Sequence, residues 1–171
     1  CLSIGQELRA LLSDAVSVSG FTAPTVGAMT AKKFSFLVED LSKQDHGLIM
    51  VMGKGGVGKT TIAVNLLSFL KANNYSTIGL KPISSGAHLS KKGLRNSDAI
   101  ALQNAATIYL PYEEVNPFCF RLSAAPHIAA AQEACQLSLA KIMQSFHPLP
   151  KYEADYCVIE GLGGAAVPLN K

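Results

Sequence analysis

The stretch Gly47-Leu-Ile-Met-Val-Met-Gly-Lys-Gly-Gly-Val-Gly-Lys-Thr-Thr61 decides the fold, because a short apolar strand runs directly into a glycine-rich loop. In such a loop, backbone N–H groups surround phosphate oxygens and the positive end of the following helix favours an anion. A glycine turn before an ordinary helix is the alternative, but it does not explain why Lys and Thr follow in that order. The template G-x-x-x-x-G-K-[ST], with a strand before it and a helix after it, is met by Gly53, Gly58, Lys59 and Thr60. The sequence therefore predicts a site for a nucleoside triphosphate.

Each part of this loop has an expected role. Lys59 is expected to reach the β- and γ-phosphates, and the Thr60 hydroxyl to bind Mg²⁺. Mg²⁺ beside a triphosphate also needs acidic partners, for which Asp98 and Glu160 are the candidates. The alternatives stay open, since the helix dipole alone favours an acidic residue at Asp98 and Glu160 can be a solvated carboxylate. The residues predicted to contact the nucleotide are Gly53, Lys54, Gly55, Gly56, Val57, Gly58, Lys59, Thr60, Thr61, Glu160, Gly161, Gly163 and Gly164.

Short apolar strands alternate with helical segments along the chain. This alternation predicts an α/β fold of the P-loop NTPase type, with a parallel sheet and helices on both of its faces. The predicted strands are Leu48–Met52, Ser76–Lys81 and Asp155–Glu160. In the helix after the loop, the apolar spacing i, i+3, i+4, i+7 is formed by Ala63, Leu66, Leu67 and Leu70. Further helices are expected over Asn96–Thr107 and Ala134–Phe146, with breaks at Asn116-Pro117 and Ala125-Pro126.

Residues 1–46 are predicted to form a lead-in helix and a linker, and residues 47–171 a partial P-loop nucleotide-binding domain. Polar chemistry follows each predicted strand of that domain, because Lys81 and Ser85 follow the second strand and Glu160 ends the third. Ligands of open α/β sheets bind beyond the carboxyl ends of the strands. We therefore expect these side chains to converge on one crevice beside the phosphate loop.

Composition excludes several classes of protein. The chain has 171 residues, 49% of them hydrophobic, and a net charge of only +3, which favours a folded domain without a nucleic-acid or membrane footprint. The small basic run Lys91, Lys92 and Arg95 is expected to be a solvated loop. Four cysteines without a C-x-x-C pair indicate reduced thiols rather than a zinc site. With no membrane-length apolar stretch and no signal pattern, the predicted location is the cytoplasm.

From about residue 67 to residue 171 the chain resembles the ATP-dependent dethiobiotin synthetases. The matching segments are Gly79–Gly86, Gly93–Ala99, Val115–Phe118, Ala125–Ile128, Ala131–Glu133, Val158–Gly164 and Val167–Leu169. The resemblance implies a homodimeric ligase of biotin biosynthesis that uses MgATP and CO₂ to convert 7,8-diaminopelargonate to dethiobiotin. It implies that Lys59 holds the β/γ-phosphates, that Lys81 and Ser85 hold a carbamate, and that Mg²⁺ is bound by Thr60, Asp98 and Glu160.

Residues 8–63 resemble instead the arsenite-pump ATPases, through Leu8–Ser13, Phe36–Leu41 and His46–Thr61. The two resemblances meet near residues 61–67, so the chain is expected to be a chimera, truncated after its third strand. In the arsenite-pump relatives the lysine at Lys54 reaches a phosphate across a dimer interface. The synthetase loop usually carries polar and acidic residues where Lys54-Gly55-Gly56 stands here, and this difference bears on how ATP is positioned.

Two other functions stay open. One is an arsenite-pump-type ATPase with a membrane partner, although Lys81-Pro-Ile-Ser-Ser-Gly86 stands where that family carries an Asp-Pro-Ala-Ala-His switch. The other is a truncated fragment that binds nucleotide and catalyses nothing.

Overall fold

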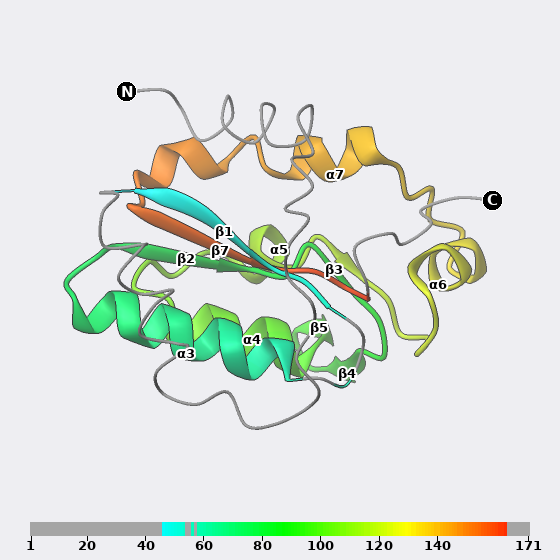
Figure 1. Ribbon diagram of the computed structural model, residues 1–171. Helices are drawn as coiled ribbons and strands as arrows, with labels where there is room; N and C mark the ends of the chain where they lie inside the picture. Colours follow the sequence, from blue (N-terminus) through cyan, green and yellow to red (C-terminus); the bar gives the residue numbers. More distant parts are fainter. Residues whose placement is uncertain (1–45, 54–55, 57, 164–171) are drawn as a thin grey trace, which may run out of the picture.

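The computed structural model describes residues 46–53, 56 and 58–163. Strands β1 (Gly47–Val51), β7 (Tyr156–Glu160) and β2 (Thr77–Leu80) form a parallel sheet in the order β1-β7-β2 (Figure 1). Each end of the three strands lies within one residue of its predicted position, and the α/β class is confirmed. The predicted lead-in helix and linker lie outside the described residues, apart from residue 46.

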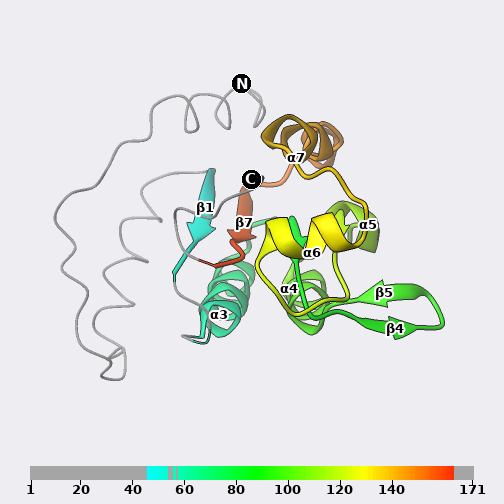
Figure 2. The same ribbon diagram turned by 90° about the vertical axis from the view of Figure 1, so that its right-hand side faces the viewer.

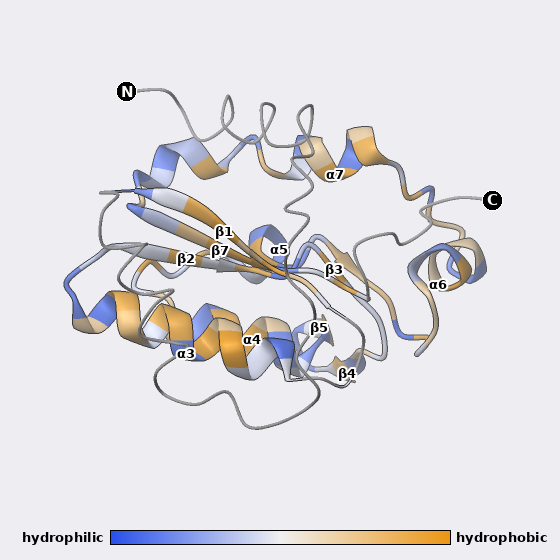
Figure 3. Ribbon diagram, in the orientation of Figure 1, coloured by the Kyte–Doolittle hydropathy of each residue, from blue (hydrophilic) through white to orange (hydrophobic). Residues whose placement is uncertain are grey.

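One face of the sheet is covered by α3 (Lys59–Ala72) and α4 (Ser97–Ala105). Figure 3 shows hydrophobic residues along the strands and on these two helices. A Cβ on Gly79 of β2 would lie 2.8 Å from the Leu102 carbonyl oxygen and 2.9 Å from Leu67 Cδ1, so a glycine is needed for this close packing. The four apolar residues predicted to form the buried stripe of α3 are all buried, namely Ala63, Leu66, Leu67 and Leu70.

The opposite face carries a second apolar cluster. It joins β2 and β7 to α5 (Tyr112–Val115) and to the 3-10 helix η1 (Leu149–Tyr152), and α7 (Leu139–Ser145) lies on this side of the sheet (Figure 2). Helices therefore cover both faces, as a parallel sheet requires.

Two helix boundaries differ from the predictions. The helix expected from Ala134 begins only at Leu139, because Ala134 adopts a φ of 51° and Ser138 caps α7 by accepting a hydrogen bond from the Lys141 N–H. The expected break at Ala125-Pro126 is the start of α6 (Pro126–Gln132), since proline is well suited to the first position of a helix.

Short strands between the main elements were not predicted. β3 (Ile83–Ser84) pairs in parallel with β6 (Phe118–Cys119), and β4 (His88–Ser90) forms an antiparallel hairpin with β5 (Gly93–Arg95). The turn of that hairpin carries the exposed Lys91 and Lys92. Arg95 departs from the expected solvated loop, because its guanidinium lies 4.0 Å from the centroid of the Tyr112 ring and pairs with Glu113 at 3.2 Å.

Candidate active site

The register of the sheet brings the ends of the strands together. Val51 pairs with Glu160, and Leu80 pairs with Ile159, so Lys81 follows β2 directly beside Glu160. Successive side chains of a strand point to opposite faces. Val158 packs in the cluster around α3, and Glu160 two residues later points to the same face, toward the first turn of that helix. The convergence expected from the sequence is present for these strand ends.

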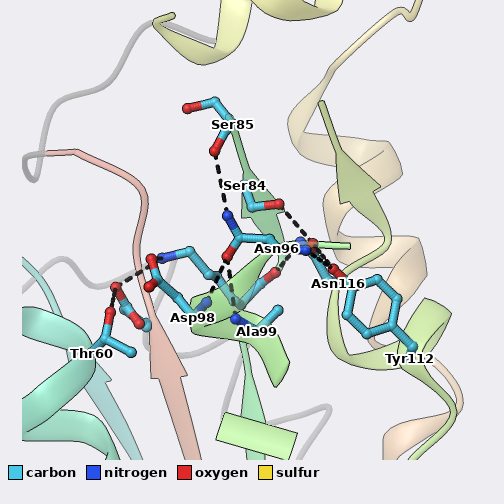
Figure 4. A network of polar contacts seen from close by, with 10 residues as sticks. Thr60, Ser84, Ser85, Asn96, Asp98, Ala99, Tyr112 and Asn116 are labelled. Carbon is cyan, nitrogen blue, oxygen red and sulfur yellow. Dashed lines mark hydrogen bonds and ion pairs between the residues drawn. The ribbon is translucent and has the colours of Figure 1, made fainter. Parts of the chain in front are cut away.

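A charge cluster lies at this point. Lys81 Nζ is 2.8 Å from Glu160 Oε1 and 3.3 Å from Asp98 Oδ2. The Thr60 hydroxyl donates a hydrogen bond of 3.0 Å to the same Glu160 oxygen (Figure 4). The Lys81 and Glu160 side chains are only 3% and 2% exposed, whereas Asp98 is 41% exposed. Lys81 and Glu160 thus form a buried ion pair, and Asp98 is the member of the cluster that solvent reaches.

The phosphate loop ends at the N-terminus of α3. Gly58 caps this helix with a φ of 79°, a left-handed conformation that favours glycine, and it has no side chain that could accept a hydrogen bond from the backbone of the first turn. The first turn contains no acidic residue either, and Lys59 is buried within it. These features leave the positive end of the helix available to an anion.

The structure describes only some of the other loop residues that were predicted to contact the nucleotide. Gly53, Gly56 and the exposed Thr61 are described, whereas Lys54, Gly55 and Val57 lie outside the described residues.

The glycines after β7 play different parts. The Gly161 N–H donates to the Val51 carbonyl oxygen at 3.0 Å, so it extends the contact between the strands. Gly163 has a φ of 79°, and Gly164 lies outside the described residues. The sharp turn after Glu160 therefore depends on Gly163 rather than on Gly161.

The site has the donor chemistry that Mg²⁺ requires. Glu160 Oε2 is buried and has no hydrogen-bond partner among the described residues, although burial of such an oxygen is costly unless it is paired. The Thr60 hydroxyl and the carboxylates of Glu160 and Asp98 are oxygen ligands of the kind that Mg²⁺ prefers. Within the described residues no three His, Cys, Asp or Glu side chains gather into a metal-binding group.

Ser85 is linked through its backbone to the N-cap of α4, and among the described residues no contact joins its side chain to the charge cluster. Its carbonyl oxygen accepts a hydrogen bond of 3.4 Å from Asn96 Nδ2, and its side chain is half-buried. No role was predicted for the side chains of Asn96 and Asn116, which hydrogen-bond this segment from two sides. The signals were present, since Asn is a preferred residue at a helix N-cap and Asn116 precedes a proline.

An apolar cavity of about 160 Å³ lies on the other face of the sheet, between β1 and α7. Its lining includes Leu48, Met50, Ile142 and Phe146. Glu160 also borders it, but its carboxylate is hydrogen-bonded to Thr60 and Lys81 on the α3 side. The cavity is therefore separate from the charged site.

Family comparison agrees with this geometry. Residues 47–171 match the family model described as "AAA domain". The chain belongs to this AAA-domain family. The match includes both the phosphate loop and the loop that carries Lys81, so the whole charge cluster falls within the AAA domain.

The chain is also similar to curated proteins named ATP-dependent dethiobiotin synthetase. The protein of Cellvibrio japonicus is 45% identical over 113 residues, which is 66% of this chain and 49% of the relative. That of Marinobacter nauticus is 42% identical over 115 residues, 67% of this chain and 49% of the relative. The protein of Pseudomonas paraeruginosa is 41% identical over 114 residues, which is 67% of this chain and 50% of the relative. The chain spans about half the length of the curated relatives it matches.

No helix among the described residues combines the length and the apolar character needed to cross a membrane.

Proposed function

We propose that this chain is a dethiobiotin synthetase-type ligase, which uses MgATP and CO₂ to convert 7,8-diaminopelargonate to dethiobiotin. The observation that carries the proposal is the buried Lys81 between Glu160 and Asp98, next to Thr60 of the phosphate loop. Relatives that are 40–45% identical to the chain over about 113 aligned residues carry the synthetase name. A P-loop alone would support only nucleotide binding, whereas the lysine supports a site for an anionic substrate.

The nucleotide is held by the loop and by α3. Lys59 binds the β- and γ-phosphates, and the N-terminus of α3, whose N-cap Gly58 has no side chain, favours the same negative charge. Thr60, Asp98 and Glu160 would hold Mg²⁺, which would supply charge neutralisation at the transferred phosphoryl group. Glu160 Oε2, buried without a hydrogen-bond partner among the described residues, is the oxygen best suited to this role.

The second substrate is held by Lys81 and Ser85. An ammonium has three N–H donors, and in Lys81 two of them are directed at Glu160 and Asp98. The third suits an oxygen of a carbamate anion, and the Ser85 hydroxyl provides a further donor. Because Lys81 is only 2% exposed, its interaction with an anion is not weakened by bulk water.

The chemistry proceeds in three balanced steps. One amine of the diamine forms a C–N bond to CO₂ and loses a proton, which gives the carbamate. A carbamate oxygen then attacks the γ-phosphorus, the bond from that phosphorus to the bridging oxygen breaks, and ADP leaves. The second amine attacks the carbamate carbon and loses a proton, the bond from that carbon to the phosphorylated oxygen breaks, phosphate leaves, and the ring closes. The protein contributes mainly position and charge neutralisation.

Two competing functions have distinct signatures. An arsenite-pump-type ATPase would hydrolyse ATP faster in the presence of arsenite, and a membrane partner would then be expected. A non-catalytic fragment would bind nucleotide saturably without turnover. The lysine that follows β2 favours the synthetase over the pump, because the pump family carries an aspartate switch at this place.

The experiment that tests the proposal measures ADP release and the incorporation of labelled bicarbonate, with and without 7,8-diaminopelargonate. The proposal predicts that both depend on the diamine and occur in equal amounts. Hydrolysis that responds to arsenite but not to diamine would support the pump instead. Binding of ATP with no release of ADP under any condition would support the fragment.

The assembly and the origin of the chain are part of the same proposal. We infer a homodimer with its active sites near the interface, located in the cytoplasm, with a segment over residues 8–63 derived from an arsenite-pump-like ATPase. Light scattering tests the dimer. Sequencing the source DNA across Thr60–Lys81 tests the junction, since a continuous reading frame is expected for a natural fusion.

A further inference from the structure

Asn116 holds the segment that carries the substrate-binding lysine. Its Nδ2 donates a hydrogen bond of 2.6 Å to the Lys81 carbonyl oxygen. Its Oδ1 accepts from the Ser84 hydroxyl at 2.7 Å and from the Tyr112 hydroxyl at 3.0 Å. Asn116 is only 2% exposed, so every bond in this group is protected from water, and one amide fixes both Lys81 and Ser84 (Figure 4).

The same network extends to Asp98, the exposed member of the charge cluster. The Tyr112 hydroxyl accepts a hydrogen bond of 2.7 Å from the Asn96 N–H. Asn96 in turn caps α4, because its Oδ1 accepts from the N–H groups of Asp98 and Ala99, and its Nδ2 donates to the Ser85 carbonyl oxygen. Asn116 and Asn96 therefore bind the Lys81–Ser85 segment at its two ends and fix it relative to Asp98.

This network is not needed to attach the segment to the fold. The Lys81 N–H donates to the Val115 carbonyl oxygen at 2.9 Å, and β3 and β6 pair independently through the carbonyl oxygens of Pro82 and Ser84. The backbone of the Lys81–Ser85 segment is thus attached to residues 115–120 by hydrogen bonds that do not involve the asparagine side chain. What the asparagine adds is a fixed position for the Lys81 carbonyl, and with it the origin of the side chain that ends between Glu160 and Asp98.

We propose that Asn116 is a positioning residue for the ligase reaction, which sets the Lys81 ammonium in place for the carbamate through its hydrogen bond to the Lys81 carbonyl oxygen. The inference rests on the proposed function, because it assigns Asn116 to the same site. Nucleotide binding by the phosphate loop does not depend on this bond, so the effect of Asn116 is confined to the step that uses Lys81.

Asn116→Asp is the sharpest variant. It keeps the shape and the two acceptor interactions, but it places an oxygen opposite the Lys81 carbonyl instead of a donor. We expect kcat for dethiobiotin formation to fall about 30-fold, in line with the cost of a misplaced catalytic group, while the affinity for ATP stays within about twofold of the wild type. Tyr112→Phe is the matched control, since it removes hydrogen bonds from the same buried network and leaves the donor to Lys81 intact. It should lower kcat less than about threefold.

A second measurement does not require turnover. In the wild type Lys81 is buried, whereas Lys71 on the surface of α3 is exposed. We expect an amine-reactive reagent, followed by mass spectrometry, to modify Lys81 several-fold faster in Asn116→Asp, with Lys71 as the internal reference. Faster modification in Asn116→Asp but not in Tyr112→Phe supports the positioning role even if the wild type forms no dethiobiotin, in which case only the proposed function fails.

Two results would overturn the inference. One is an unchanged rate of Lys81 modification in Asn116→Asp. The other is an equal loss of kcat, ATP affinity and melting temperature in Asn116→Asp and Tyr112→Phe, which would show that the network serves the fold alone.

Discussion

The two ends of the central sheet carry polar clusters of opposite character. At the amino end the Asp155 carboxylate accepts hydrogen bonds from the Ser76 N–H and hydroxyl at 2.6 and 2.7 Å, and the Asp155 N–H donates to the Ser76 hydroxyl oxygen at 2.9 Å. Thr77 and Thr107 exchange backbone-to-hydroxyl hydrogen bonds in the same region. These polar groups connect strands and loops that the fold has already brought together.

At the carboxyl end, charge is concentrated and less completely paired. Two carboxylates share the single ammonium of Lys81, and one oxygen of the buried Glu160 has no hydrogen-bond partner within the described residues. Such an arrangement costs free energy that a purely structural cluster would avoid. The difference indicates that the amino-end cluster stabilises the sheet, whereas the carboxyl-end cluster is kept for a ligand.

Lys81→Ala should have the largest effect. It leaves Glu160, 2% exposed, without its partner at 2.8 Å, and we expect the free energy of unfolding to fall by about 3 kcal/mol. Dethiobiotin formation should cease while ATP still binds to the folded fraction. Denaturant unfolding and calorimetric titration measure the two quantities. If Lys81→Met/Glu160→Gln does not recover stability over Lys81→Met alone, the explanation by an unpaired buried charge is wrong.

Lys59→Ala should act on nucleotide binding alone. Loss of a charge-assisted contact to phosphate weakens binding by about 100-fold, and titration with MgATP measures it. Lys71→Ala, at an exposed position near the end of the same helix, is the control. Equal loss of ATP affinity in the Lys59 and Lys81 variants would contradict the division of roles between the phosphate loop and the β2 lysine.

Local patterns predicted the elements that meet at the carboxyl end. The phosphate-loop motif and the stripe Ala63, Leu66, Leu67 and Leu70 depend on short-range geometry, so α3 and the α/β class followed from the sequence. Lys81 and Glu160 were expected to lie close together, since the carboxyl ends of parallel strands share one edge of the sheet. Asp98, in the first turn of α4, was expected there only as a candidate partner for Mg²⁺. Their functional roles remain predictions that the variants test.

Long-range pairing was not predictable in the same way. The insertion of β7 between β1 and β2 depends on contacts across about a hundred residues, and no local pattern encodes it. β3 and β6 contain two residues each, too few to show an alternation. The start of α7 was misplaced because a left-handed Ala134 has no recognisable sequence signal. Asn116 was read as a break because its role depends on Lys81, 35 residues earlier.

Asp155→Ala tests the amino end of the comparison. Loss of the two hydrogen bonds to the carboxylate should lower the free energy of unfolding by about 2 kcal/mol. Glu160 lies five residues after Asp155, a separation of about 16 Å in extended chain, so the affinity for MgATP should not change. Denaturation and titration of the same sample measure both. A parallel loss of ATP affinity would mean that the two clusters are coupled through β7.

Cys157 lies on β7 between the two clusters. The pH dependence of stability that its thiol causes is the smallest of the predicted effects, and it reports on β7 alone. Burial raises the pKa of its thiol to about 12, from an ordinary value of 9.0. The folded protein therefore keeps the proton at a pH where the unfolded chain loses it. This stabilising contribution is complete below pH 9 and is lost as the pH rises toward 12, with a slope of up to about 1.4 kcal/mol per pH unit.

Burial also raises the pKa of the Tyr112 hydroxyl, which adds a loss of the same sign. Cys157→Ala removes only the thiol contribution, so the difference in slope between the two proteins, measured by denaturation between about pH 8 and pH 10.5, isolates it. The reaction of Cys157 with a thiol reagent also measures how well β7 is protected in variants of the amino-end and carboxyl-end clusters. Protection of Cys157 that survives in Lys81→Met/Glu160→Gln, where no buried charge is left unpaired, but weakens in Asp155→Ala would show that the amino-end cluster holds the strand in the sheet, whereas the carboxyl-end cluster acts on the ligand. Equal exposure of Cys157 in both variants would mean that the two ends of β7 stabilise the strand alike, and the contrast between them would then lie only in their charge.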